Sequence, residues 1–322
     1  MASRSLVVSV AMLVASAGCA STTTRTDHSE TTRSSTTAGA TATTSSIQVA
    51  TTANATTSTR PTSPVTMTTT RPTSSTTTSA LTTTTTAPEA ATGTGSVDAS
   101  LDGIRGRVVS IDPGHNGANG RHTAEINRLV DIGNGKKACN TTGTASNAGY
   151  SEASFNFDVA TRVTALLRAA GATVVMTRTD NDGWGPCINV RAGIANAAHA
   201  DAAVSIHADG AAASDRGFHV IRPLAVPGVN DRIVEPSARL AARLRAAFEP
   251  IAGLPPSNYI GRDGLIERND LGGLNLAQVP AVFIECGNMR NAADIAVLAS
   301  DSGRQRIARG VAAGIASYLR ST

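Results

Sequence analysis

The sequence has few aromatic residues, few cysteines and no apolar run long enough to cross a membrane. Aromatic residues make up 3% of the 322 residues, and no basic segment has aromatic residues placed between its cations. Because that combination and DNA-binding motifs are both missing, we expect no nucleic-acid partner. The apolar run at residues 6–17 is shorter than the roughly 20 residues that a transmembrane helix requires.

The N-terminus has the pattern of an export signal. Residues 1–4 are basic, and the apolar run follows them directly. Residues 15–17 form a small-residue site that a signal peptidase could cut to release a soluble protein. Residues 17–19 also resemble a bacterial lipobox, in which Cys19 becomes acylated. We expect a signal peptide with a lipobox at residues 1–19 and an anchor on the outer face of the cytoplasmic membrane; a secreted or periplasmic protein is the alternative.

Thr and Ser dominate residues 20–103, which contain almost no aliphatic runs. Such a segment buries too little apolar surface to offset the entropy of ordering it, so we predict a disordered stalk. A single folded domain is predicted at residues 104–322, a length that can bury a substantial core. The formal net charge of +4 predicts a mildly basic surface without a charge-driven function.

Three cysteines remain after Cys19: Cys139, Cys187 and Cys286. Export to an oxidising compartment permits disulfide formation. Cys139 and Cys187 both lie in polar, glycine-rich segments, and we predict a bond between them; two free surface thiols are the alternative. Closing a loop of about 48 residues would stabilise the fold by about 4 kcal/mol in the chain-entropy model.

Short apolar, β-rich segments alternate with helical patterns in the folded part, which is typical of an α/β sheet. One connection, residues 116–150, is irregular and too long for a simple loop, so it is predicted to be functional or mobile. We predict strands at residues 107–112, 173–178, 203–207, 217–221 and 281–285, and helices at residues 152–170, 189–198, 236–248, 292–298 and 305–319.

Three candidate metal ligands lie at the ends of these elements. His115 follows the first predicted strand, His207 ends the third, and Glu152 begins the first predicted helix. Because sites in α/β sheets form at the carboxyl ends of the strands, these three side chains can converge. Two imidazoles and one carboxylate are a typical ligand set of catalytic Zn²⁺, with a fourth position left for water.

Glu285 is the candidate general base. It ends the last predicted strand, whose other members are all apolar, and a carboxylate there is costly unless it is used or paired. Strand alternation points Cys286 to the opposite face, which weakens a rival mechanism with Cys286 as the nucleophile.

Each of these residues also has a purely structural explanation. A histidine taken alone is more often a hydrogen-bonded structural residue, and Glu152 alone would suit the first turn of a helix. His122 and Glu125 are rival ligands but are predicted to be solvated loop residues. Residue chemistry by itself leaves the zinc site and the structural explanation equally open. The other histidines, His28, His199 and His219, are predicted to have no catalytic function.

Four separated motifs strengthen the case. Residues 111–115 read Ile-Asp-Pro-Gly-His, residues 149–152 Gly-Tyr-Ser-Glu, residues 204–209 Val-Ser-Ile-His-Ala-Asp, and residues 280–288 Pro-Ala-Val-Phe-Ile-Glu-Cys-Gly-Asn. With these motifs, residues 108–319 resemble the zinc-dependent N-acetylmuramoyl-L-alanine amidases of bacterial cell-wall turnover. The chain is similar in particular to the compact mycobacterial members, which share the positions of Cys139 and Cys187.

The resemblance implies a fold, a cofactor and roles for the residues. The family fold is a mixed, mostly parallel central sheet flanked by helices on both faces. The matching positions imply one Zn²⁺ on His115, Glu152 and His207, with Glu285 as the catalytic residue. Asp209 and Asn275 depart from residues common in the family, and we expect them to contact substrate.

The implied function is hydrolysis of the amide bond between N-acetylmuramic acid and L-alanine in peptidoglycan or its muropeptide fragments, by a monomer. Two alternatives remain. A zinc peptidase that cuts within the stem peptide would use the same metal ligands, and a catalytically inert peptidoglycan-binding lipoprotein would need neither metal nor base.

Overall fold

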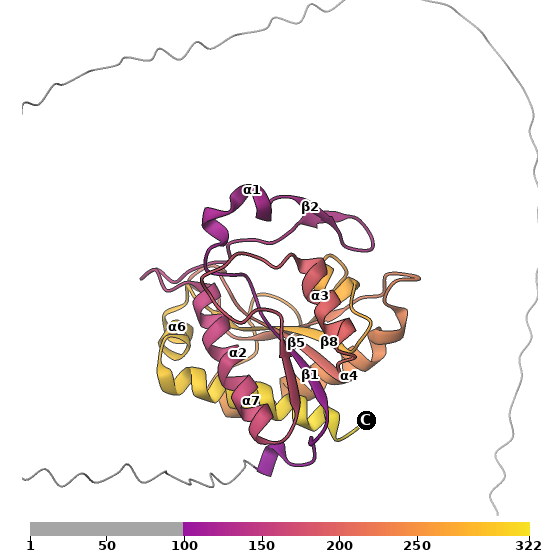
Figure 1. The fold of residues 1–322 in the computed structure, drawn as a ribbon. Helices are drawn as coiled ribbons and strands as arrows, with labels where there is room; N and C mark the ends of the chain where they lie inside the picture. The colour runs from indigo at the N-terminus through magenta and orange to yellow at the C-terminus, as the bar shows by residue number, and fades with distance from the viewer. Residues whose placement is uncertain (1–98) are drawn as a thin grey trace, which may run out of the picture. The chain divides into compact units, whose positions relative to one another are not determined.

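The computed structural model describes residues 99–322 (Figure 1). The predictions for Cys19, His28, the signal peptide and most of the stalk fall outside this range. Within it, no helix is both long and apolar enough to cross a membrane.

A six-stranded mixed sheet forms the centre of the domain, in the order β4-β1-β5-β8-β6-β7. The first four of these strands run parallel, β6 runs antiparallel to β8, and β7 runs parallel to β6. The predicted mixed, mostly parallel sheet is therefore confirmed. The strands are β1 (Val108–Pro113), β4 (Thr173–Met176), β5 (Ala202–Asp209), β6 (His219–Pro223), β7 (Leu265–Arg268) and β8 (Ala281–Asn288).

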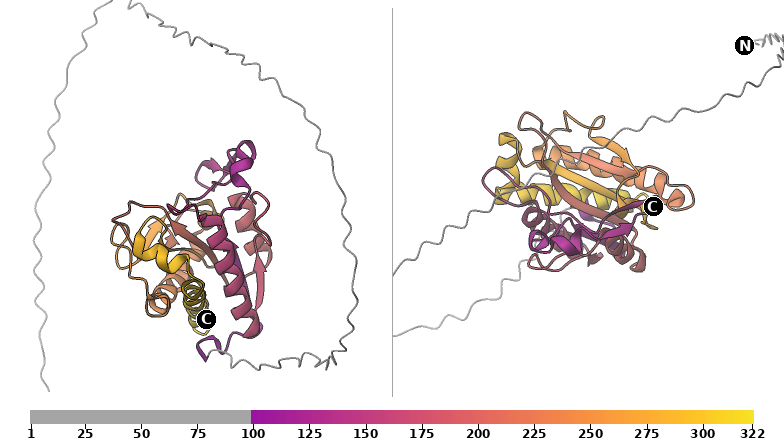
Figure 2. Two further views of the ribbon diagram at one scale, coloured as in Figure 1. Left: turned by 90° about the vertical axis from the view of Figure 1, so that its left-hand side faces the viewer. Right: turned by 90° about the horizontal axis from the view of Figure 1, so that it is seen from above.

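Helices cover both faces of the sheet (Figure 2). Alternate residues of β1 show the division: Val109 and Ile111 belong to the main core, whereas Ser110 and Asp112 point to the opposite face. The main core packs against α2 (Glu152–Ala169), α4 (Asp231–Phe248) and α7 (Asp301–Leu319), and the other face lies under α3 (Ile188–Ala197) and α5 (Gly272–Asn275). The remaining helical segments are η1 (Ala99–Leu101), η2 (Asn119–Arg121), α1 (Thr123–Ile126), the π-helical turn η3 (Glu249–Gly253) and α6 (Ala292–Leu298).

Helix α2 shows how the sequence sets the boundaries that matter for the site. Ser151 is its N-cap and accepts a hydrogen bond from the Ser154 backbone amide. A buried stripe at four-residue spacing (Phe155, Val159, Val163, Leu167) then faces the sheet. Because the cap fixes the start of the helix, Glu152 lies in its first turn, at the carboxyl edge of the sheet.

Several boundaries differ from the predictions. Helix α4 begins at Asp231 and not at residue 236, because Pro236 lies inside the helix and Ile233 is already buried before it. Helix α7 begins at Asp301, where Ser300 caps it. Strand β7 was not predicted, because its sequence Leu-Ile-Glu-Arg has neither the apolar run of β4 nor an alternation of apolar and polar residues.

The connection at residues 116–150 is not irregular throughout. It contains η2, α1 and a hairpin of β2 (Leu129–Asp131) and β3 (Lys136–Ala138). The predicted disulfide between Cys139 and Cys187 is present, with an S–S distance of 2.04 Å, and it ties the base of the hairpin to the start of α3. Lys137 Nζ also donates to Asp270 Oδ2 at 3.0 Å. The hairpin is therefore anchored to the domain at two points.

Candidate metal centre

His115, Glu152 and His207 meet at the carboxyl edge of the sheet, and each offers one ligand atom within 4.8 Å of the others. Glu152 Oε1 lies 3.1 Å from His115 Nε2 and 2.9 Å from His207 Nδ1. Ligands at 2.0–2.1 Å around a tetrahedral zinc ion lie about 3.3 Å apart. Among the described residues these three form the group that could hold a metal ion, and the sequence predicted all of them.

Local backbone geometry explains how the cluster forms. His115 turns away from β1 with φ of +58°, a left-handed conformation that is costly for a residue other than glycine. The preceding residue must be Gly114, because a Cβ there would overlap the His207 imidazole. Gly143 similarly packs against the cluster, and a Cβ there would lie 2.8 Å from Glu152 Oε2. The site thus requires that the backbone at Gly114 and at Gly143 lies close to the side chains of the cluster.

The hydrogen bonds of the two histidines fix which nitrogen faces the centre. The Thr141 carbonyl can only accept a hydrogen bond, so His115 donates to it from a protonated Nδ1 at 3.1 Å. The Nε2 atom of His115 is then unprotonated, and its lone pair faces Glu152. Ser205 donates its hydroxyl to Asp112 Oδ2 at 2.5 Å and accepts from His207 Nε2 at 3.1 Å. His207 therefore presents its Nδ1 lone pair to the centre.

Three acceptor atoms consequently face one another with no donor between them. Burial would raise the pKa of Glu152, but in the metal-free protein protons shared with His115 and His207 hold it well below its usual value, so positive charge in the cluster keeps the carboxylate ionised. Lone pairs at 2.9 and 3.1 Å from a carboxylate oxygen repel it unless a cation or protons lie between them. The donor set and its geometry thus fit a divalent metal ion.

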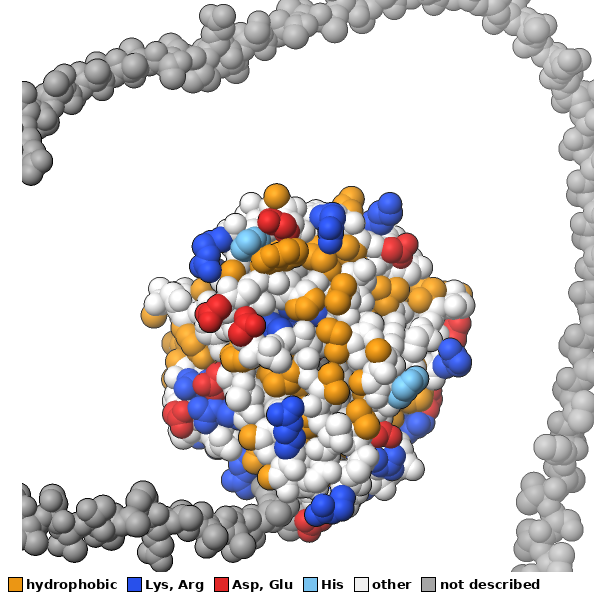
Figure 3. Space-filling view, viewed as in Figure 1, with side chains coloured by type: hydrophobic (Ala, Val, Ile, Leu, Met, Phe, Trp, Pro, Cys, Tyr) orange, Lys and Arg blue, Asp and Glu red, His pale blue; other side chains and the backbone are white. Residues whose placement is uncertain are grey.

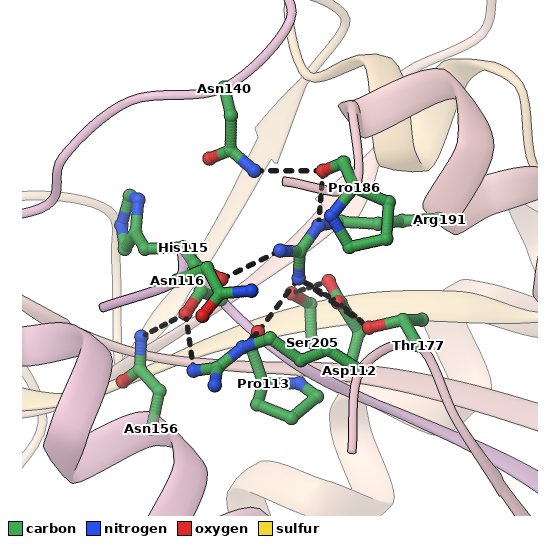
Figure 4. Close-up of polar contacts among 12 residues, drawn as sticks. Asp112, Pro113, His115, Asn116, Asn140, Asn156, Thr177, Pro186, Arg191 and Ser205 are labelled. Carbon is green, nitrogen blue, oxygen red and sulfur yellow. Dashed lines mark hydrogen bonds and ion pairs between the residues drawn. The ribbon is translucent and has the colours of Figure 1, made fainter. Parts of the chain in front are cut away.

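Two buried arginines hold the backbone that carries these residues (Figure 4). Arg191 donates to Asp112 Oδ1 at 2.6 Å, and also to the carbonyls of Pro113, His115, Gly185 and Pro186. Arg178 donates to the carbonyls of Pro113, Gly114 and Ala153. The end of β1 is thereby fixed to the start of α2.

Asp112 anchors the same network. Burial alone would raise its pKa, but Arg191 and the hydroxyls of Ser205 and Thr177 lower it to about 2. Asp112 is therefore charged at neutral pH, and it holds Ser205 in the orientation that His207 requires.

Glu285 lies beside the cluster without belonging to it. It is the register partner of His207 across the parallel pair β5 and β8, so both side chains point to the same face. Its Oε2 atom is buried and has no hydrogen-bond partner. Burial, followed by the nearby carboxylates of Glu152 and Asp209, raises its pKa well above the usual value, while Arg268 opposes this. An unpaired buried carboxyl beside a metal-binding cluster is suited to proton transfer.

Two cavities flank the cluster and share His115 and His207 in their walls. One, of about 370 Å³, contains Glu152, Glu285, Asp209 and Arg268. The other, of about 190 Å³, is mostly apolar and lies against the hairpin; its lining includes Lys137, Ile188, Leu271 and Phe283. The cluster therefore lies in the middle of an extended cleft.

The two residues expected to contact substrate lie in different environments. Asp209 lines the larger cavity and accepts from the Tyr259 hydroxyl at 2.7 Å. Asn275 is fully buried, and its Nδ2 donates to Ile132 O, Asn134 Oδ1 and Asn269 O, at 3.0, 3.1 and 2.7 Å. We therefore assign Asn275 to the support of the hairpin and not to substrate contact.

The rival ligands lie outside the cluster. His122 and Glu125 pair with each other at 3.2 Å, and both are substantially exposed. Cys286 is buried in the main core, on the face opposite Glu285, as the strand alternation predicts.

Sequence reasoning missed three residues around the cleft. Arg268 and Tyr259 lie in short or irregular segments that carry no periodic signal, although Arg268 lines the larger cavity. His219 is buried opposite Glu285 on β6, its Nδ1 has no partner, and burial lowers its pKa to about 4. A histidine directly before two β-branched apolar residues of β6, Val220 and Ile221, was the available signal.

Known proteins resemble this chain in sequence and in fold. A family model described as N-acetylmuramoyl-L-alanine amidase matches residues 109–317. The N-acetylmuramoyl-L-alanine amidase Rv3717 of Mycobacterium tuberculosis is 44% identical over 225 residues, covering 70% of this chain and 91% of that protein.

Two solved structures agree. Ami1 amidase of Mycobacterium smegmatis has a TM-score of 0.64 at 43% identity, covering 68% of this chain and 99% of that one. Ami1 amidase of Mycobacterium abscessus, in its apo form, has a TM-score of 0.64 at 46% identity, covering 67% and 100%. The family resemblance predicted from the motifs is thus confirmed, and the chain belongs to the N-acetylmuramoyl-L-alanine amidase family.

Proposed function

We propose that this chain hydrolyses the amide bond between the lactyl group of N-acetylmuramic acid and L-alanine in peptidoglycan, with Zn²⁺ held by His115, Glu152 and His207. Family membership supports the reaction, and a peptidoglycan substrate is consistent with an envelope or extracellular role. The observation that carries the zinc proposal is the meeting of three acceptor atoms within 4.8 Å, beside the unpaired carboxyl of Glu285.

The donor set favours zinc over other divalent ions. Ca²⁺ and Mg²⁺ prefer all-oxygen ligands, whereas two imidazoles and one carboxylate suit zinc and leave one position open. Zinc bound there would polarise the lactyl carbonyl and lower the pKa of a water molecule to about 7.

The protein side chains would handle the proton. Glu285 would take a proton from the attacking water and deliver it to the departing L-alanine amine. Its raised pKa describes the protein without metal, and a bound cation would lower it toward the range that a base requires. Asp112 and Ser205 would keep His207 in its ligating tautomer.

Glu285→Gln tests the assignment of the base. This variant should bind one zinc ion per chain, by metal analysis, and lose turnover, whereas His115→Ala should lose both. Wild-type activity in Glu285→Gln would refute the assignment.

Mass spectrometry of digested peptidoglycan tests the bond that is cut. An amidase releases intact stem peptides and peptide-free glycan. Fragments of the stem peptide would instead indicate a zinc peptidase, and an undigested wall would indicate an inert binding protein.

We also propose that the enzyme is exported and anchored through Cys19, with residues 20–103 as a tether for a monomeric catalytic domain at residues 104–322. The support is the sequence pattern described above. Cys19→Ala should move the protein from the membrane fraction to the soluble fraction of the envelope, and unchanged fractionation would refute the anchor.

A further inference from the structure

An exposed pair of aromatic rings lies on the surface of the domain. Trp184, the only tryptophan of the chain, is 38% exposed and stacks on His122, with ring centroids 5.6 Å apart and an interplanar angle of 22°. We name this pair the Trp184–His122 platform. Figure 3 shows hydrophobic side chains and a histidine gathered over the region of α1 and β2. Tryptophan is enriched at interfaces, where its ring packs while its N–H keeps a polar partner.

A single buried residue, Asn119, holds the backbone of both segments that carry the rings. Its carbonyl accepts from the backbone amide of His122 at 3.0 Å, and its Oδ1 accepts from the amide of Gly185, next to Trp184, at 2.9 Å. The carbonyl of Gly185 is also held, by Asn116 Nδ2 and by Arg191 Nη2. The backbone on which both rings stand is therefore held before any ligand binds, which reduces the entropic cost of binding.

The same asparagine connects the platform to the metal centre. Asn119 Nδ2 donates to the Thr141 carbonyl at 2.7 Å, and that carbonyl also accepts from Nδ1 of His115. On the other side, Ile188 lines the smaller cavity and lies four residues after Trp184, which limits their Cα separation to about 14 Å. The platform is thus linked through Asn119 to the wall of the smaller cavity, since His115 and Thr141 both line that cavity.

We propose that the Trp184–His122 platform binds a sugar ring of the glycan strand, next to the N-acetylmuramic acid whose amide is cut. This site rests on the proposed function for its ligand and lies outside the catalytic cluster. A pyranose ring presents a face of C–H groups that packs on the electron-rich face of an aromatic ring. Its hydroxyl and acetamido groups need donors and acceptors around that face.

The surroundings of the platform match this ligand. Glu125, which is 45% exposed, pairs with His122 and offers acceptor oxygens, while the exposed Arg121 and Arg128 offer donors. An aromatic ring flanked by hydrogen-bonding side chains offers both kinds of contact that a sugar ring makes. Because the glycan continues on both sides of the sugar that enters the cleft, a neighbouring ring can reach the rim.

The unique tryptophan provides a direct binding assay. The full-length chain should show a saturable change in tryptophan fluorescence on titration with the peptide-free trimer of N-acetylglucosamine. It should show no change with the dipeptide L-alanyl-D-isoglutamine, which lacks sugar. This measurement requires no catalysis, so it tests the platform even if the proposed reaction is wrong.

Kinetics with two matched substrates test whether the platform serves the reaction. The short substrate is N-acetylmuramoyl-L-alanyl-D-isoglutamine, and the long one carries the same dipeptide on a tetrasaccharide. Trp184→Ala should lower kcat/KM for the long substrate about tenfold, mainly through KM, because one stacking contact is lost. It should leave the short substrate unchanged, which also shows that the variant is folded.

Trp184→Tyr keeps an aromatic ring and should recover most of the loss. Leu129→Ala removes an exposed aliphatic side chain nearby (64% exposed) and should have no effect.

Three results would overturn the proposal: unchanged fluorescence with the sugar trimer, equal kcat/KM of Trp184→Ala and wild type on the long substrate, or an equal loss on both substrates. A loss in Leu129→Ala as large as in Trp184→Ala would indicate a general apolar docking surface and would also refute it. If wild type hydrolyses neither substrate but still shows the fluorescence change with the sugar trimer, the proposed reaction is wrong and the proposed sugar site stands.

Discussion

Glu285 and His219 are register partners across the antiparallel pair of β8 and β6, so a half-buried carboxyl and a buried imidazole occupy adjacent positions on one face of the sheet. Each has a buried side-chain atom without a hydrogen-bond partner, Oε2 and Nδ1 respectively. Burial raises the pKa of Glu285 and lowers that of His219. At neutral pH the imidazole is therefore uncharged and adds no positive charge beside the Glu285 carboxyl.

This arrangement predicts acid sensitivity of the fold. The pKa of His219 is about 4 in the folded chain and about 6.5 in an unfolded one, so the unfolded state binds more protons between these values. The free energy of unfolding should fall by up to about 3 kcal/mol as the pH drops from 6.5 to 4. Urea unfolding in the presence of a chelator measures this slope. His219→Gln should flatten it, and His199→Asn, which removes an exposed histidine, is the control. An equal slope in His219→Gln would contradict the prediction.

Ser205 should determine zinc affinity although it is not a ligand. Ser205→Ala removes the acceptor that holds the Nε2 proton of His207, so Nδ1 is no longer reserved for metal. We expect zinc affinity to fall about 10- to 100-fold, measured by competition with a chromogenic chelator. Thr177→Val removes another hydroxyl that bonds to Asp112 but does not contact His207, and it should change affinity much less. Equal affinities of Ser205→Ala and wild type would show that the tautomer is fixed by other contacts.

Gly114 should be required for metal binding. Gly114→Ala would place a Cβ inside the His207 imidazole, so that ring must move and the ligand geometry is lost. Zinc binding and turnover should both be abolished. Gly120→Ala lies in the connection that follows, where only Thr142 Cγ2 is near the added Cβ, at 4.0 Å. This variant should retain zinc binding and turnover. Binding of one zinc ion per chain by Gly114→Ala would show that the site does not require a glycine beside the His207 imidazole.

The disulfide should stabilise the domain without taking part in the chemistry. The double variant Cys139→Ser, Cys187→Ser opens a loop with a sequence separation of 48 and should lower the free energy of unfolding by about 4 kcal/mol in the chain-entropy model. Chemical denaturation measures the difference. Reductant should lower the stability of wild type by a similar amount and leave the double variant unchanged. A further loss on adding reductant to the variant would implicate another effect of the reductant.

The sequence predicted which side chains meet at the candidate site better than it predicted the element boundaries. His115, Glu152, His207 and Glu285 were found because strand ends and a capped helix start are visible as patterns, and their convergence follows from the topology of parallel sheets. The start of α4 was misplaced because a proline usually marks a helix start, whereas Pro236 lies within the helix. The location of Asn275 depends on long-range bonds to the hairpin at Ile132 and Asn134, which no local pattern reveals.

Along β5, Val204 and Ile206 point into the main core while Ser205 and His207 point away from it, so the candidate ligand His207 is not part of that core. Chelation should consequently silence the enzyme while leaving its tertiary structure intact, unlike zinc fingers, whose folding depends on the ion. Activity would then be switched off and restored by withdrawing and returning the ion, with no refolding step between the two states.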